Sequence, residues 1–413
     1  MIETVQDDNN ELVKQVQSNI LEKHKKLFLD NKDPDFWNKQ EEAIRQETRL
    51  LIGQEDIRAE IYVTDQLIGY KDIGPFMRDP EITDIFINNL EVYIKRNSGS
   101  KIKTGIKFNS SAEIMKILQS VVQKAGREIN FSHPLVNVML PGGMRLNAVI
   151  SPNATSPAIS IRKFPKKVYT AAELVQQGFI NQDMQIFFEN MVRAGCNIVI
   201  AGQTGSGKTT FTRHLCVYIP EGERVITIED TFELGLEGVV ALQQSPKASI
   251  KDLIENALRM DPDRIILGEF RGDEAYQILQ AMDTGHFGSM TTGHANNAKM
   301  NLFQRLLRAM SGSGLSDGEL AGHIVNSIDL TVYIKKFKDG KWCITEVNEL
   351  IDDSGKPFFK EIYKYNRKTN RHECLNSLSP ELLERLQDEL GNEKLPQIKP
   401  FSGPPKAREM VAV

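Results

Sequence analysis

Cysteine is scarce in this sequence of 413 residues, and the few cysteines lie far apart. They are Cys196, Cys216, Cys343 and Cys374. No two of them form a C-x-x-C pair, so the sequence predicts neither a disulfide framework nor a zinc knuckle. Such a pattern is typical of a protein of the reducing cytoplasm.

Long apolar runs and an excess of positive charge are also missing. No stretch approaches the roughly 18 uninterrupted apolar residues that indicate a transmembrane helix. The first residues lack the apolar core of a signal peptide. The formal net charge is -4, whereas proteins that grip nucleic acid usually carry a strong positive excess. We therefore expect a cytoplasmic protein that does not require nucleic acid.

The first part of the chain is charged, with apolar residues such as Leu12, Val16 and Ile20 at helical spacing. We predict a helical N-terminal segment over residues 1–60. Short strand patterns and one amphipathic helix pattern, ended by Gly126, then alternate along the chain. They predict an α+β N-terminal domain over residues 61–165.

Buried-strand patterns resume after a predicted linker at residues 166–180. The runs "NIVIA", "RVITIED" and "DRIILGE" alternate with helical patterns, which favours an α/β domain with a parallel-rich sheet over residues 181–350. A hairpin is predicted around Asp339 and Gly340. Residues 351–413 are predicted to hold the C-terminal hairpin and helix, closed by Gly391, and a loose Pro-rich tail.

The loop after "NIVIA" matches the phosphate-binding pattern G-x-x-x-x-G-K-[ST] in full, as "GQTGSGKT". Glycines at 205 and 207 let successive N–H groups face an anion, and the following helix adds its positive end. Lys208 can reach the β- and γ-phosphates, and the Thr209 hydroxyl can bind Mg²⁺. We therefore expect ATP and Mg²⁺ here, with the nucleotide bound by Gly202, Gln203, Thr204, Gly205, Ser206, Gly207, Lys208, Thr209 and Thr210.

Acidic residues follow two of the predicted strands. Glu269 ends "RIILGE", where a P-loop protein holds the metal, and we predict that it shares Mg²⁺ with Thr209. Glu229 and Glu233 lie in "ITIEDTFEL". We predict Glu233 as the base that orients the attacking water, with Glu229 and Glu269 shaping the metal shell. A solvated acidic loop is the alternative for any one of them.

Four blocks in a fixed order carry a resemblance to a known family. The sequence resembles the ATPases of the type II/type IV secretion superfamily, in particular the CpaF-like members of tight-adherence pilus and conjugative systems. The blocks are similar to that family's Walker A, Asp box, Walker B and His box, and they read "GQTGSGKTT", "ITIEDTFEL", "LRMDPDRIILGEFRGDEA" and "AMDTGHFGSMTTGHAN". The resemblance covers roughly residues 70–350.

The resemblance implies roles for two histidines and two arginines. His286 and His294 would lie near the γ-phosphate end of the site or relay its state to the domain interface; the alternative is that both only pack a tight loop. Arg145 and Arg162 would approach the phosphates as fingers; the alternative is that they are surface strand residues. Gly293, together with Phe287, departs from the residues common in relatives.

The resemblance also implies the function as a whole. It implies a RecA-like P-loop domain preceded by a smaller α+β domain, in a cytoplasmic ATPase that hydrolyses ATP to power pilus assembly or secretion of protein or DNA. Such a motor resembles ring-shaped homo-hexamers that act on a membrane platform protein, peripherally associated with the inner or plasma membrane through partners. Two other classes stay open: a nucleic-acid-dependent helicase or translocase, and a scaffold that binds nucleotide without hydrolysis.

Overall fold

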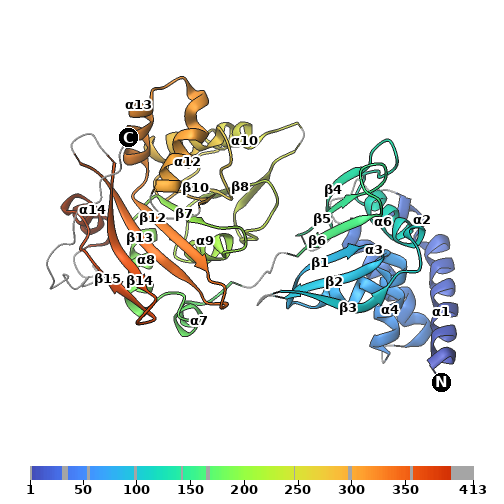
Figure 1. Ribbon diagram of the computed structural model, residues 1–413. Coiled ribbons are helices and arrows are strands. Elements are labelled where there is room, and N and C mark those ends of the chain that lie inside the picture. Colours follow the sequence, from blue (N-terminus) through green and yellow to red (C-terminus); the bar gives the residue numbers. More distant parts are fainter. Residues whose placement is uncertain are drawn as a thin grey trace. The chain divides into compact units, whose positions relative to one another are not determined.

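The computed structural model divides into two compact units, residues 1–165 and 166–413 (Figure 1). The structure describes residues 2–29, 36–53, 56–96, 100–140, 143–163, 168–245, 247–295, 300–353 and 357–391.

The first unit begins with helices, and polar side chains cap the N-termini of two of them. The helices are α1 (Ile2–Lys23), α2 (Lys25–Leu29), α3 (Phe36–Ile52), α4 (Ile57–Ile68), the 3-10 turn η1 (Lys71–Ile73), α5 (Gly74–Arg78) and α6 (Ser111–Lys124). The side chains of Asp56 and Ser110 accept hydrogen bonds from the backbone N–H groups of Ala59 and Glu113, which satisfies the first turns of α4 and α6.

The six-stranded sheet of the first unit is antiparallel, in the order β3-β2-β1-β6-β5-β4. Its strands are β1 (Ile82–Asn88), β2 (Glu91–Arg96), β3 (Lys101–Lys107), β4 (Leu135–Leu140), β5 (Met144–Val149) and β6 (Ala158–Arg162). Burial alternates along β6, where Ile159 and Ile161 are buried and Ser160 is exposed. One face of this sheet therefore builds a core, and the other faces solvent.

The N-terminal helices share that core. Val16 of α1, Ile44 of α3 and Val63 of α4 are fully buried in the same cluster as Ile85 and Ile161 of the sheet. An amphipathic helix is stabilised mainly by packing its apolar face, and this sheet supplies the partner surface. Residues 1–60 are thus part of the first unit, which differs from the expected separate segment.

The second unit is built on a nine-stranded sheet in the order β15-β14-β13-β12-β7-β11-β10-β8-β9. The strands from β12 to β9 are parallel, and β13, β14 and β15 continue the sheet in antiparallel fashion. They are β7 (Ile198–Gly202), β8 (Val225–Glu229), β9 (Val240–Gln243), β10 (Arg264–Leu267), β11 (Met290–His294), β12 (Leu330–Lys336), β13 (Trp342–Asp352), β14 (Pro357–Asn366) and β15 (Arg371–Cys374). The predicted α/β class with a parallel-rich sheet is confirmed.

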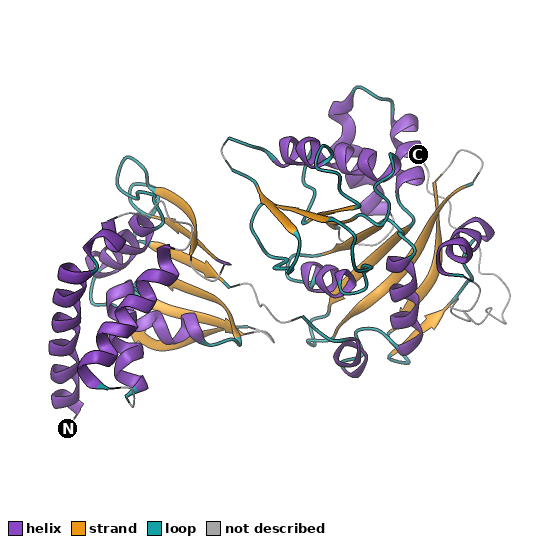
Figure 2. Ribbon diagram, turned by 180° about the vertical axis from the view of Figure 1, so that it is seen from behind, coloured by secondary structure: helices purple, strands orange, loops and turns teal. Residues whose placement is uncertain are grey.

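Helices cover both faces of this sheet (Figure 2). One face packs α10 (Ile250–Ala257), α11 (Glu274–Asp283), α12 (Met300–Met310) and α13 (Asp317–Ser327), the last preceded by η3 (Ser311–Ser313). The other packs α7 (Ala171–Gln176), α8 (Gln182–Arg193), α9 (Lys208–Cys216) and α14 (Pro380–Leu390). The central strands β7, β8 and β10 are buried along their whole length, which explains their continuous apolar sequences.

The boundaries expected at both ends of the second domain differ from those of the unit. Within the expected linker, residues 171–176 form α7, and Leu174 and Phe179 are buried in the core of the second unit. At the other end, β13 runs through Asp352, and β14, β15 and α14 extend the same sheet and core. The expected hairpin is present as β12 and β13, with Gly340 at φ 86° in its turn. The predicted loose tail lies, from residue 392 onward, outside the described residues.

Across the described part of the chain, no helix is both long enough and apolar enough to cross a bilayer.

Candidate nucleotide-binding site

The phosphate-binding loop lies at the carboxyl end of β7, between the ends of β11 and β12. The loop leaves the strand at Gly202, and α9 begins at Lys208. Gly205 and Gly207 have φ values of 71° and 88°, in the left-handed region that favours glycine. The strand, loop and helix N-terminus thus have the arrangement that presents backbone N–H groups to an anion.

Lys208 is buried beneath this loop, with only 7% of its surface exposed. Its Nζ lies 3.2 Å from the carbonyl oxygen of Gly202, 3.4 Å from that of Gln203 and 3.3 Å from Nδ1 of His294. Burial lowers the pKa of the ammonium group, and the carboxylates of Glu269 and Glu233 oppose that shift. A partly desolvated cation held by neutral carbonyls is well suited to receive a phosphate oxygen.

Glu269 and His294 extend this arrangement across two neighbouring strands. Nε2 of His294, at the end of β11, lies 2.9 Å from Oε1 of Glu269, which follows β10. Arg271 lies 3.6 Å from the other oxygen of Glu269 and 3.0 Å from Asp230. Burial and the positive charge of Lys208 lower the pKa of His294. The result is a chain of contacts along the carboxyl edge of the sheet, in which the imidazole of His294 joins the ammonium of Lys208 to the carboxylate of Glu269.

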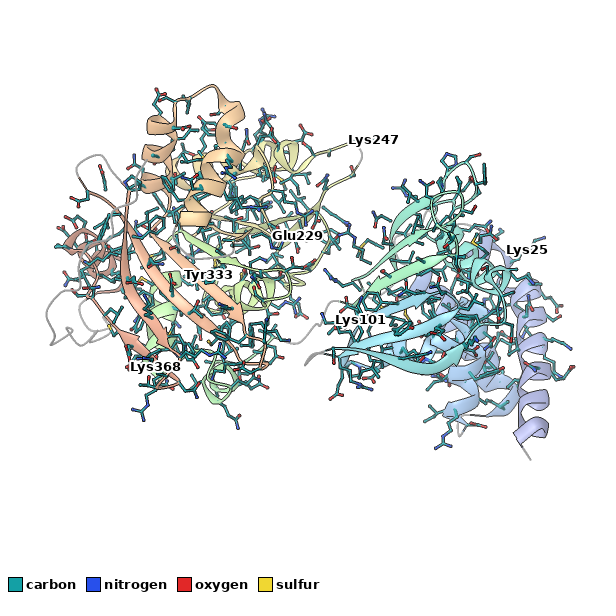
Figure 3. All side chains as sticks on the ribbon, in the orientation of Figure 1. Lys25, Lys101, Glu229, Lys247, Tyr333 and Lys368 are labelled. Carbon is teal, nitrogen blue, oxygen red and sulfur yellow. The ribbon has the colours of Figure 1, made fainter. Side chains whose placement is uncertain are left out.

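Glu229 and Glu233 occupy the same edge, after β8; Figure 3 labels Glu229. Oε2 of Glu229 accepts hydrogen bonds from the backbone N–H groups of Glu233 (2.7 Å) and Leu234 (2.9 Å). Burial nevertheless raises the pKa of Glu229 to about 7. The Thr209 hydroxyl donates to Oε2 of Glu233 at 3.3 Å, and Arg213 donates to the Glu233 carbonyl. Glu229 therefore holds the loop that brings Glu233 to the first turn of α9.

An open cleft of about 1070 Å³ lies beside these groups. Its walls come from the phosphate-binding loop, the segment after β10, the end of β11 and α12. The α12 wall carries Arg305 and Arg308, and the charge of Arg305 acts on both Lys208 and His294. Neither arginine was predicted from the sequence as a site residue. Their i, i+3 spacing in an amphipathic helical pattern after the His box could have indicated that both side chains lie on one face of a helix.

The two histidines do not lie together. His286 precedes β11, and its Nδ1 lies 2.8 Å from the carbonyl oxygen of Pro262 at the opposite edge of the sheet. A strand rises about 3.3 Å per residue, so the length of β11 separates the two imidazoles. The structure thus does not bring His286 to the phosphate-binding loop, whereas His294 contacts Lys208 directly. A relay of the nucleotide state by His286 stays a prediction.

The unusual Gly293 has a packing cause. A β-carbon at this position would lie 2.5 Å from two carbons of the Phe270 ring. Phe270 is fully buried after Glu269, so its ring fills the space that a larger residue at 293 would need. Phe287 is 56% exposed.

Arg145 and Arg162 lie on the sheet of the first unit. They are direct cross-strand partners in β5 and β6. Nε of Arg162 lies 3.2 Å from Oδ1 of Asp84, and the side chain is 55% exposed. The two arginines thus form a cationic pair beside one carboxylate, on the solvent-facing side of that sheet.

The edge of the second unit fits a nucleotide-borne magnesium ion. Among the described residues, no group of three or more His, Cys, Asp and Glu side chains is arranged to hold a metal. Mg²⁺ keeps several waters and binds through substrate phosphates with one or two protein ligands. The hydroxyl of Thr209 and the carboxylates of Glu233 and Glu269 are protein oxygens of the required kind.

This fold and site define a P-loop nucleoside triphosphatase of the RecA-like type. The chain belongs to the type II/IV secretion system protein family, whose model matches residues 73–332. Over 324 residues it is 31% identical to the type IV secretion system protein VirB11 of Bartonella quintana, an alignment that covers 67% of this chain and 90% of that one.

Solved structures agree in fold. The ATPase DotB of Yersinia pseudotuberculosis is similar with a TM-score of 0.50 and 21% identity, covering 68% of this chain and 78% of that chain. The pilus retraction motor PilT with bound ADP is similar with a TM-score of 0.50 and 17% identity, covering 68% of this chain and 83% of that chain. At these identities the likeness supports the architecture alone.

Proposed function

We propose that this chain is a motor that hydrolyses ATP with Mg²⁺ and uses the energy to drive assembly of a pilus, or secretion of protein or DNA, through a membrane complex. The observation that carries the proposal is the contact of buried Lys208 with His294, and of His294 with Glu269, beside a complete phosphate-binding loop. A generic phosphate-binding loop has no need for this histidine.

The residues of the second unit have distinct tasks in hydrolysis. Lys208 exchanges the carbonyls of its own loop for the β- and γ-phosphate oxygens. Thr209 and Glu269 would hold a magnesium ion, which would supply positive charge to the phosphate oxygens. Glu233, which Glu229 holds in place, accepts the proton of the attacking water. His294 joins Lys208 to Glu269, so loss of the γ-phosphate alters its contacts.

We propose that the working form is a homo-hexamer in the cytoplasm, docked at the inner or plasma membrane through a platform protein. Arg145 and Arg162 then serve as fingers that offset charge on the transferred phosphoryl group. The resemblance to ring ATPases and the adjacent cationic pair on the first unit support this assignment. Nucleic acid is not required for turnover, and clear stimulation by DNA would favour a helicase or translocase instead.

Lys208→Ala tests the proposal directly. The variant should release no phosphate from ATP above background, because the main phosphate cation is gone. Lys338→Ala removes an exposed lysine of the same unit and should keep full turnover. Phosphate release by the full chain, with circular dichroism to verify folding, gives the answer. Wild-type turnover in Lys208→Ala, or no turnover in the wild-type chain with lipid and platform protein, would refute hydrolysis at this site.

A further inference from the structure

We infer that Trp342 is a positioning residue of the nucleotide site, which fixes one peptide group of the phosphate-binding loop through a hydrogen bond from its indole. The inference rests on the proposed binding of nucleotide by this loop. Trp342 is the first residue of β13, in the hairpin that follows β12.

The indole contacts the loop in two ways. Its Nε1–H donates to the backbone carbonyl oxygen of Ser206 at 2.5 Å. Its six-membered ring lies against Gly207, where a β-carbon would come within 2.5 Å of Cζ2. Gly207 is thus restricted twice, by its φ of 88° and by the indole that covers it.

The hydrogen bond controls the direction of an N–H group. A trans peptide is planar, so the carbonyl of Ser206 and the N–H of Gly207 point in opposite directions. When Trp342 holds the carbonyl on its own side, the N–H of Gly207 points away from the indole. In a phosphate-binding loop these backbone N–H groups cradle the phosphates. The indole therefore orients one donor of the cradle before nucleotide arrives, which reduces the cost of ordering the loop on binding.

The indole is itself held on its other side. The ring of Phe179 lies 4.0 Å from it, centroid to centroid, and the ring of Tyr169 lies at 6.0 Å. Phe179 is fully buried and also packs against Phe211 of α9, at 5.3 Å. Trp342 is thus enclosed between the loop and a buried aromatic cluster, which suits a fixed support rather than a platform for the adenine base.

A packing role and a positioning role predict different results for Trp342→Phe. The phenyl ring keeps much of the apolar contact but has no N–H donor. With the full chain, we expect the affinity for ADP by calorimetry to fall about 3- to 10-fold, the range of one net hydrogen bond. Trp37→Phe, which changes the other tryptophan of the chain, is the matched control and should bind ADP as the wild type does. Unchanged ADP affinity in a folded Trp342→Phe chain would overturn the inference.

A second measurement leaves the indole in place, so it decides the matter even if Trp342→Phe fails to fold. In Trp37→Phe, Trp342 is the only tryptophan. Its emission should change saturably with ADP, at the concentrations where calorimetry detects binding, because a phosphate charge comes to lie on the far side of the peptide group that accepts the hydrogen bond of the indole. Bound ADP without a change in emission would contradict the positioning role and leave the proposed function intact. A wild-type chain that binds no ADP would overturn the proposed function and the inference with it.

Discussion

The sheets of the two units differ in where they present polar side chains: on one face in the first unit, and at the carboxyl ends of the strands in the second. The antiparallel sheet of the first unit runs its strands in both directions and leaves one face to solvent, where Arg145 and Arg162 sit side by side. The central parallel strands β7, β8 and β10 of the second unit are buried on both faces, and their carboxyl ends meet at one edge. Strand direction thus determines where site residues can gather. In a parallel sheet, the residues that follow several separate strands meet at the same edge.

The charges of the two units contrast in the same way. Charged groups of opposite sign lie near each other along the edge of the second unit, as Lys208 and Arg271 do with Glu269. The arginine pair of the first unit places like charges directly opposite each other, which costs stability in a sheet, and Arg162 lies 3.2 Å from Asp84. Variants of each unit test whether the arginines serve catalysis.

After the complete loss expected of Lys208→Ala, the largest effect is expected from the first unit. Arg162→Ala should lower turnover by about 10³-fold, since a finger acts on the transition state, while the affinity for ADP changes little. Phosphate release and calorimetry on the same preparation separate the two quantities. Arg96→Ala removes another arginine of that sheet and should be nearly silent. Doping Arg162→Ala into wild type should depress activity more than in proportion. An active Arg162→Ala chain would confine catalysis to the second unit.

A smaller loss is expected within the second unit. Glu233→Gln should keep ATP binding but hydrolyse it about 10²-fold more slowly, because the amide keeps the shape and removes the base. Single-turnover hydrolysis compared with Glu229→Gln and Glu269→Gln ranks the three acids. Should Glu233→Gln be fully active while either of the others is dead, the base has been assigned to the wrong carboxylate.

The two histidines provide a contrast inside one sequence block. His294→Ala should lower turnover by about tenfold, since it breaks the link between Lys208 and Glu269, and a net hydrogen bond contributes up to about 1.5 kcal/mol, which is roughly tenfold. His286→Ala should stay within about twofold of wild type, the scale of a few tenths of a kcal/mol. Steady-state rates of both variants are sufficient. Equal losses of turnover in the two variants would mean that His286, at the opposite edge of the sheet, also affects hydrolysis.

The last prediction for these residues concerns stability rather than turnover. Burial raises the pKa of Glu229 from 4.5 to about 7, so the folded chain binds more protons than the unfolded chain between these values. The free energy of unfolding should therefore fall as pH rises from 4.5 to 7, by up to roughly 3 kcal/mol from this group. Glu229→Gln should flatten that slope in urea titrations of the second-unit transition, and exposed Glu221→Gln should not. An unchanged slope in Glu229→Gln would mean that Glu229 stays ionised.

Local patterns predicted the strands and the loop well. The runs that became β7, β8 and β10 are continuous apolar segments, and the phosphate-binding loop needs only contiguous residues. β11 was not foreseen, since "MTTGH" carries hydroxyls and glycine in place of branched apolar residues, and without that strand the two histidines could not be told apart in space. The shared core of α1 to α4 with the first sheet depends on contacts that no local pattern encodes.

The contact of Trp342 with the phosphate-binding loop could not be predicted from the sequence. Its hydrogen bond joins residues 136 positions apart, and a tryptophan at the start of a hairpin strand is ordinary in itself. Arg305 and Arg308 were accessible in principle, through helical spacing, but their direction toward the cleft follows from how α12 packs on the sheet.

The place of β7 in the sheet has a consequence for synthesis of the chain. This strand, which bears the phosphate-binding loop, pairs with β11 on one side and β12 on the other. Both neighbours leave the ribosome long after β7, and translation adds roughly 5–20 residues per second. A nascent chain therefore carries β7 with two unpaired edges for several seconds, a state prone to aggregation. Truncation before β12 should leave one of these edges permanently open, and such chains should accumulate as insoluble protein.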